Sequence, residues 1–468
     1  MNKYKRLASN TMLFAISTFS SKLLTFLMSP LFTYWFATQE MKGVKDLAMQ
    51  CANLLIPLVS LGISNSVIRF GLEKGIPKQQ VFSNGFSAIM AGFVLMILLY
   101  PALRLIPLMQ DYILYIYIYV LVSCMRTLCC QFCRAKLYNR LYAIDALLCT
   151  ITTVAFQVLF IAVLDLGAVG YLLSVICGDA LRAIFLFVVA GLHRYLGFRY
   201  FNKDLLFKML RYSLPLVPAS IFWWVTNASD QFFVTAMCGI KWNAIYTSSY
   251  VLPSMLSIVA SVFTEAWQLS AVTDGQGEGR ERFFSKVFGA YQSVMFTAGA
   301  GVILMAQPYM GVLREDYFIG WKFMPVLVLA TIFSSFDNFL NSVYMVEKRS
   351  TLSLVTMAVG AVANCVLNFA LIPIWGVNGA AIATFASYFI VFVLRVVNTR
   401  GLIKINFGFG RMAINLLLVC ASGAIMLKQV PYWPLWCTLI TVLVAMYNMG
   451  NLWTTAARLL GMDKKKKR

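Results

Sequence analysis

Long apolar runs follow one another along this chain and limit what it can fold into. About fourteen runs can be marked, and most have about 20–30 residues, enough for a helix to cross a bilayer. Of the 468 residues, 60% are hydrophobic and 12% are charged, whereas a soluble domain has about 25% charged residues. A water-soluble core cannot bury so much apolar surface. The sequence therefore predicts an all-α integral membrane protein with about 14 transmembrane helices.

The positions of Lys and Arg predict the topology. If the first residues lie in the cytoplasm, the inside segments hold a roughly fourfold excess of basic residues over the outside ones. In this count Lys42 and Lys45 belong to the outside segments and Arg395 to the inside ones. Both termini are then cytoplasmic, and the net charge of +21 reflects topology and not nucleic-acid binding. The expected spans cover residues 10–37, 44–70, 81–108, 111–137, 142–164, 168–192, 205–238, 243–272, 283–308, 317–346, 351–373, 378–398, 411–428 and 432–457.

A weak internal repeat divides the spans. The segment from Asp165 to Gly170, at the start of the sixth span, is similar to the segment from Ile374 to Gly379, at the start of the twelfth. Six spans per unit give two lobes of the same orientation, a parallel repeat found in some transporters. We expect an N-lobe in residues 1–200, a C-lobe in residues 201–403, and two further helices with a basic cytoplasmic tail in residues 404–468.

Ionisable residues inside the expected spans are functional candidates, because a charge in lipid is costly unless it is paired or wetted. The spacing of Asp179 and Arg182 fits an ion pair on one helix face. Asp145 and Glu265 lie toward span ends, so reaching the interface is an equally good interpretation. Four others lack an opposite charge three or four residues away, and line a wet cavity or pair between helices, as Lys22 can with Asp230. These four are Lys22, Arg126, Asp230 and Asp337.

The sequence argues against an enzyme and predicts no catalytic residue and no metal site. His193 is the only histidine, and it lies among basic residues at a span end. Cys130 and Cys133 have the C-x-x-C spacing but lie in an apolar span without a second pair. A phosphate-binding G-x-x-x-x-G-K-[ST] loop is absent from the sequence, so we expect no ATP hydrolysis.

Three segments resemble the polysaccharide transporter branch of the multidrug/oligosaccharidyl-lipid/polysaccharide flippase superfamily. They are the first span with Ser20, Ser21, Lys22 and Pro30, the seventh from Leu214 to Gly239, and the run from Gly376 to Thr384. The resemblance implies two six-helix lobes around a central cavity. It also implies transfer of undecaprenyl-pyrophosphate-linked oligosaccharides from the cytoplasmic to the outer leaflet. Relatives often have Arg directly after the aspartate of the seventh span. Here Gln231 follows Asp230, so this lobe lacks the phosphate-binding cation that the resemblance would imply at that position.

A lipid-linked sugar suggests roles for the candidate residues. Lys22 and Arg126 are expected to bind the pyrophosphate, because cations form strong hydrogen bonds with phosphate oxygens. Polar and aromatic faces for sugars are available on two spans, although packing and lipid contact are the ordinary uses of such residues. A carboxylate is expected to bind H⁺ or Na⁺ and to couple its gradient to transport. The sugar-binding candidates are Trp223, Trp224, Asn227, Tyr246, Tyr250 and Trp267, and the coupling candidates are Asp230, Glu265 and Asp337.

These observations predict a flippase of the bacterial inner membrane that works by alternating access. Its expected partners are the lipid-linked oligosaccharide, membrane lipids and polysaccharide assembly proteins; it needs no cofactor beyond a coupling ion, and we expect a monomer. A lipid II flippase and a drug/cation antiporter of the same superfamily are alternatives. The first is disfavoured because the first span lacks the expected Arg-x-x-Gly pattern. A membrane polymerase or ligase fits less well, because the outside loops are short.

Overall fold

The computed structural model describes residues 26–73, 75–98, 100–103, 107–261, 263–264, 280–347 and 349–459, and in them every regular element is a helix. Eleven of these helices are long and apolar enough to cross a membrane, and α2 with α3 makes a twelfth if this pair, bent by 48°, is one span. The predicted all-helical membrane fold is therefore confirmed for the part described. The expected spans 10–37 and 243–272 extend into residues that the structure does not describe, so the total of 14 stays a prediction.

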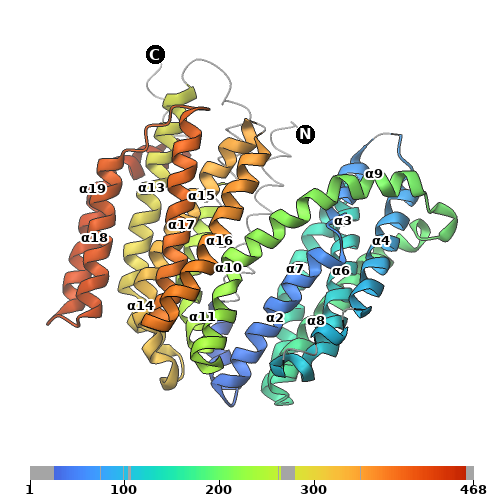
Figure 1. Ribbon diagram of the computed structural model, residues 1–468, viewed down its shortest axis with the longest axis horizontal. Coiled ribbons are helices and arrows are strands. Elements are labelled where there is room, and N and C mark those ends of the chain that lie inside the picture. Colours follow the sequence, from blue (N-terminus) through green and yellow to red (C-terminus); the bar gives the residue numbers. More distant parts are fainter. Residues whose placement is uncertain are drawn as a thin grey trace. The chain divides into compact units, whose positions relative to one another are not determined.

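The chain forms two compact units, Met1–Phe232 and Phe233–Arg468. In unit 1, α6 packs against α2, α3 and α8, and α8 packs against α7 (Figure 1). The elements are α2 (Gln39–Val59), α3 (Ile63–Leu72), α4 (Lys78–Leu98), α5 (Tyr100–Leu103), η1 (Pro107–Tyr112), α6 (Ile113–Ala135), α7 (Asn139–Gln157), η2 (Val158–Val163), α8 (Gly167–Val189), η3 (Leu192–Tyr195), η4 (Phe198–Tyr200), α9 (Lys203–Ser213), η5 (Leu214–Leu216) and α10 (Val217–Cys238), which continues into unit 2.

The bend between α2 and α3 follows Pro57, which cannot donate a backbone hydrogen bond inside a helix. Leu61 and Gly62 then take φ values of +50° and +63°, which end α2 and redirect the chain. The second expected span is therefore a broken helix and not a straight one.

The segment that leads into the seventh span packs on unit 1. The Ser66 hydroxyl donates a 2.6 Å hydrogen bond to the Met209 carbonyl of α9. Asn84 of α4 donates to the Asn202 carbonyl at 2.9 Å and accepts from the Asn202 amide at 3.1 Å. Residues 201–232, which the sequence analysis places in the C-lobe, thus belong to unit 1.

Unit 2 is organised around α15, which packs against α11, α13 and α17. The Phe336 ring lies 5.3 Å from Phe288, 5.6 Å from Phe333 and 5.8 Å from Phe392, between ring centroids, so aromatic rings from three helices form its core. The elements are α11 (Ile240–Ser254), α13 (Arg280–Leu304), α14 (Ala306–Val312), η6 (Glu315–Lys322), α15 (Met324–Val346), α16 (Ser350–Trp375), α17 (Val377–Arg400), α18 (Phe409–Leu427) and α19 (Trp433–Leu459).

The turns that enter α8 and α17 share a glycine with positive φ. Gly167 and Gly376, which the repeat aligns, have φ values of +53° and +55°. Three residues later a Cβ atom on Gly170 would lie 2.6 Å from the Phe160 carbonyl oxygen, and one on Gly379 would lie 2.3 Å from that of Leu371. The short sequence repeat thus marks a glycine turn with a close backbone approach in both units, although Asp165 also has a positive φ of +50° and its counterpart Ile374 is helical.

Replacing Gly92 with Ala is expected to destabilise unit 1. A Cβ atom there would lie 1.9 Å from the Val59 carbonyl oxygen of α2, so α2 and α4 would have to separate. Overpacking of this kind costs about 1–3 kcal/mol. Thermal unfolding of the detergent-solubilised protein measures the loss. Gly301→Ala in α13 is the control, because nothing lies within 4 Å of its Cβ position; equal melting temperatures for the two variants would contradict the prediction.

Candidate functional site

Four charged side chains from three helices of unit 1 form one cluster: Arg126 from α6, Asp145 from α7, and Asp179 and Arg182 from α8. The cluster carries two positive and two negative charges. Arg126 is the fourteenth of the 23 residues of α6, so the cluster lies well inside the spans. Because each carboxylate contacts a guanidinium, the cost of placing these charges in the membrane is largely offset.

The inner pair of the cluster is Arg182 with Asp145. Arg182 donates from Nε to Asp145 Oδ1 and from Nη2 to Oδ2, both at 2.9 Å. The side chains are 7% and 4% exposed. This bidentate geometry is the strongest that an Arg and a carboxylate form. It joins α7 to α8 and buries the Asp145 carboxylate between them.

The outer pair is Arg126 with Asp179. Arg126 Nε lies 3.1 Å from Asp179 Oδ1 without hydrogen-bond alignment, and Arg126 Nη1 is 4.0 Å from Asp145 Oδ2. The side chains are 22% and 13% exposed, more than those of the inner pair. Asp179 also accepts a 3.1 Å hydrogen bond from Arg182, the pair expected from their spacing. The Arg126 guanidinium is therefore neutralised but held by few directed bonds.

A second charged group in unit 1 was missed by the sequence analysis. Lys42 and Lys45, counted with the outside segments, are buried in α2, and both contact Asp46, Lys42 at 3.0 Å. Lys45 Nζ also lies 4.6 Å from the ring centroid of Tyr171 in α8. The helix begins at Gln39, five residues before the expected span 44–70. Two lysines and an aspartate within five residues were the available signal.

In unit 2 a buried charge pair joins α15 to α17. Arg395 donates from Nη1 to the Asp337 backbone carbonyl at 2.6 Å and from Nε to Thr356 Oγ1 of α16 at 3.1 Å. The two Asp337 carboxylate oxygens make no hydrogen bond with any described residue, although Asp337 is 5% exposed. Arg395 was counted with an inside segment and lies near the end of the expected span 378–398. The helix α17 extends to Arg400, and the Arg395 side chain is buried.

The clusters of the two units occupy equivalent helix positions. Arg126 and Asp337 are each the fourteenth residue of their helices, α6 and α15. Asp145 and Thr356 are each the seventh residue of α7 and α16. The last helix of each triplet supplies an arginine to this seventh position. The repeat has therefore kept the location of a polar centre while its charges have changed.

Polar side chains on α16 and α17 form another group that the sequence analysis missed. Asn368 donates to Asn364 at 3.0 Å, and Asn364 donates to Ser387 at 3.5 Å. Thr384 lies 3.4 Å from the Tyr246 hydroxyl of α11. Two Asn residues four apart in an apolar run indicate this polar group in the sequence. They are not ionisable, so they were not among the candidate residues.

The remaining expected site residues lie in α10, in α11 or outside the described residues. Trp224 of α10 donates to the Gln50 carbonyl at 3.0 Å, whereas Trp223 is largely exposed, and Asn227 donates to the Trp223 carbonyl at 2.7 Å. Asp230 is buried in α10, and the Tyr250 ring in unit 2 lies 6.4 Å from Tyr246. The other three, Lys22, Glu265 and Trp267, lie outside the described residues.

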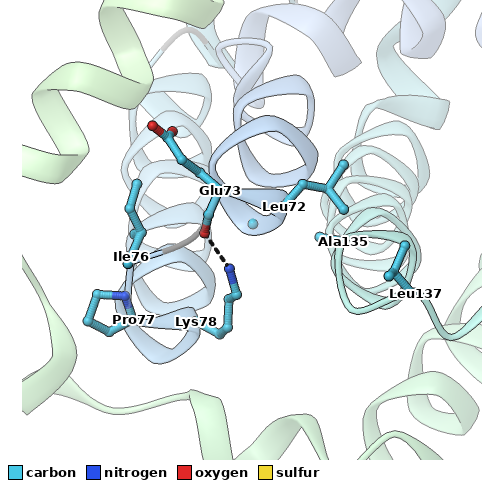
Figure 2. A pocket seen from close by; sticks show the side chains of 9 residues that line it. Leu72, Glu73, Ile76, Pro77, Lys78, Ala135 and Leu137 are labelled. Carbon is cyan, nitrogen blue, oxygen red and sulfur yellow. Dashed lines mark hydrogen bonds between the residues drawn. The ribbon is translucent and has the colours of Figure 1, made fainter.

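A cavity of about 510 Å³ lies elsewhere, where the α3–α4 connection meets the end of α6 (Figure 2). Lys78 donates to the Glu73 carbonyl at 2.8 Å, drawn as the dashed line, and the other lining residues are apolar or glycine. None of the expected site residues lines it. The described residues also hold no group of three or more His, Cys, Asp or Glu placed to bind a metal ion.

Comparison with known proteins identifies the family. A family model described as "Polysaccharide biosynthesis protein" matches residues 7–267, more than half of the chain. The chain belongs to this family. Its fold is similar to that of the lipid II flippase MurJ in an inward closed conformation, with a TM-score of 0.71 and 15% identity over 96% of this chain and 99% of that one.

Multidrug transporters share the fold as well. An inward-facing MATE transporter of the MOP superfamily has a TM-score of 0.67 and 14% identity, over 81% of this chain and 95% of that one. A Vibrio cholerae MATE transporter mutant has a TM-score of 0.55 and 14% identity, over 85% and 97%. No curated protein sequence gives a significant match. The chain is thus a multi-pass membrane protein of the polysaccharide biosynthesis family, and its fold is similar to that of lipid and multidrug transporters.

Breaking the inner pair is expected to destabilise unit 1 strongly. Arg182→Met removes both hydrogen bonds of the buried Asp145, leaves only Arg126 at 4.0 Å, and gives the cluster one excess negative charge. Breaking a buried pair in this way costs about 3–5 kcal/mol. The double variant Asp145→Leu/Arg182→Met removes both charges and is expected to recover part of this loss. Thermal unfolding of the three proteins measures the order. Arg314→Ala, in the more exposed 2.7 Å pair with Asp316, is the control and costs about 0–1 kcal/mol; a similar loss for Arg182→Met would contradict the assignment.

Proposed function

We propose that this protein is a flippase that carries undecaprenyl-pyrophosphate-linked oligosaccharide from the cytoplasmic to the outer leaflet of the bacterial inner membrane. The observation that carries the proposal is the partly exposed Arg126 guanidinium, held at membrane depth in a chain of the polysaccharide biosynthesis family. A lipid-linked sugar has an anionic diphosphate that must cross an apolar layer. A guanidinium inside the spans lowers that cost through charge-assisted hydrogen bonds.

Substrate binding divides between two kinds of side chain in this proposal. Arg126, with Lys22 of the first span, binds the diphosphate. Trp223, Trp224 and Asn227 of α10, with Tyr250 of α11, provide aromatic faces and amide groups for the sugars. Trp224 is held in place by its hydrogen bond to Gln50, whereas the exposed Trp223 is available for stacking. Alternating access of the two units then moves the bound headgroup across the membrane.

In this proposal a carboxyl group in unit 2 couples alternating access to an ion gradient. Asp337 is buried and its two carboxylate oxygens lack hydrogen-bond partners among the described residues. An ionised carboxylate in that position is costly, so binding H⁺ or Na⁺ stabilises it. The contact from Arg395 to α15 and α16 links this event to helix packing. Asp230 and Glu265 are the other carboxyl groups proposed for this role.

Replacing Arg126 with Ala is expected to slow flipping by about 10- to 100-fold, since a hydrogen bond to a charged group contributes about 1.5–3 kcal/mol. The assay follows a fluorescent undecaprenyl-diphosphate-linked oligosaccharide in proteoliposomes, with a quencher in the outer solution. Arg134→Ala is the matched control, because Arg134 lies at the end of the same helix, where it bonds Gln131 and is outside the charged cluster. Equal rates for the two variants would remove Arg126 from the binding site.

The same proteoliposomes separate the rival functions. Transport of lipid II without its sugar-linked counterpart would favour a lipid II flippase. Export of cationic dyes driven by an ion gradient, with no lipid movement, would favour a drug antiporter.

Asp337→Asn is expected to abolish the dependence of flipping on an imposed gradient and to leave slow equilibration of the substrate. The amide cannot bind and release a proton and lacks the charge that attracts Na⁺. The measurement compares proteoliposomes with a pH gradient, a Na⁺ gradient or neither. Asp316→Asn, in the more exposed pair with Arg314, is the control and is expected to respond like the wild type. Full stimulation of Asp337→Asn by either gradient would exclude Asp337 as the coupling group.

A further inference from the structure

The charge balance of the unit 1 cluster restricts what can bind there. With no substrate, two guanidinium groups and two carboxylates cancel. An anionic ligand that engages Arg126 removes one positive charge from this balance. Arg182 is then left with Asp145 and Asp179, and one negative charge is in excess at membrane depth. Such a charge is costly unless another cation arrives.

The geometry indicates which carboxylate is released. Asp145 is held by two 2.9 Å hydrogen bonds from Arg182 and is 4% exposed. Asp179 keeps one 3.1 Å hydrogen bond from Arg182, and its contact with Arg126 is not aligned as a hydrogen bond. At 13% exposure Asp179 is also the more accessible of the two. A phosphate oxygen can therefore replace Asp179 on Arg126 without disturbing the inner pair.

We propose that Asp179 is an exchangeable counter-ion for Arg126, and that the displaced carboxylate takes up one proton from water when a diphosphate binds. This inference rests on the proposed function and adds a proton to the loaded state. The step is balanced: the Arg126–Asp179 contact is lost, an Arg126–phosphate contact forms, and one H⁺ joins a carboxylate oxygen of Asp179. No covalent bond within the substrate changes.

The other described groups around Asp179 do not supply the missing charge. From α6 it faces Arg126 and Tyr119, from α7 it faces Asp145, and on its own helix it contacts Arg182. Among other described groups against α8, Lys45 of α2 lies at Tyr171 and His193 of η3 at Phe187, about two turns away on either side. Within the cluster, protonation of Asp179 thus removes the one negative charge that Arg126 no longer balances.

The inference is tested by counting protons in titrations of the full chain in lipid nanodiscs with undecaprenyl diphosphate. Calorimetry in two buffers of different ionisation enthalpy gives the number taken up. The wild type is expected to take up about one more proton per ligand than Asp179→Asn, because the ligand's own titration is common to both. Its affinity is also expected to fall more steeply as pH rises, by up to about tenfold per pH unit relative to the variant. Asp204→Asn, an exposed carboxylate of α9, is the matched control and is expected to behave like the wild type.

The outcomes separate this inference from the proposed function. Binding with equal proton uptake in the wild type and Asp179→Asn overturns the counter-ion role and leaves the substrate class standing. No binding of undecaprenyl diphosphate to the wild type overturns both. Should Asp179→Asn fail to fold, infrared difference spectra of the wild type give the answer: a new carboxylic-acid C=O band on ligand addition supports the exchange, and its absence overturns it.

Discussion

The need to neutralise charge inside an apolar solvent governs the interior of this protein. A lone charge at the centre of a membrane helix costs about 2.5–3.5 kcal/mol even on the most permissive scale. In unit 1 ion pairs among the side chains of α6, α7 and α8 offset this cost, because each carboxylate contacts a guanidinium. In unit 2 a single guanidinium, that of Arg395, bonds α15 and α16 from α17. The hydrogen bonds and ion pairs of these charged groups therefore also join the helices within each unit.

Stability and function place different demands on these groups, and the unit 1 cluster divides them between its members. The inner pair has full hydrogen bonding and almost no exposure, so it suits a fixed joint. The outer pair is more open and less well aligned, so its partner can be replaced. The chain belongs to the polysaccharide biosynthesis family and has a flippase-like fold, and the proposed anionic lipid headgroup would require such a cation within the membrane.

Sequence reasoning recovered the fold class, the family and most span positions, because apolar runs and Lys/Arg asymmetry are local signals. It could anticipate the contact between Asp179 and Arg182, since both lie on one helix. It could not find the partner of Asp145, because the approach of α7 to α8 depends on packing over many residues. Lys42 and Lys45 were counted with the outside segments for a related reason: the apolar run begins after the helix does. Hydropathy alone therefore does not reveal that charged residues near the start of a helix are buried.

The balance of the unit 1 cluster also bears on voltage. One elementary charge crossing a membrane potential of 100 mV is worth about 2.3 kcal/mol. Two cations and two anions that travel together through the field do no net electrical work. A movement of these four residues through the field is therefore electroneutral. The membrane potential acts on unit 1 only through its other charges, such as the net charge of +1 on Lys42, Lys45 and Asp46, and through any charge that a ligand brings.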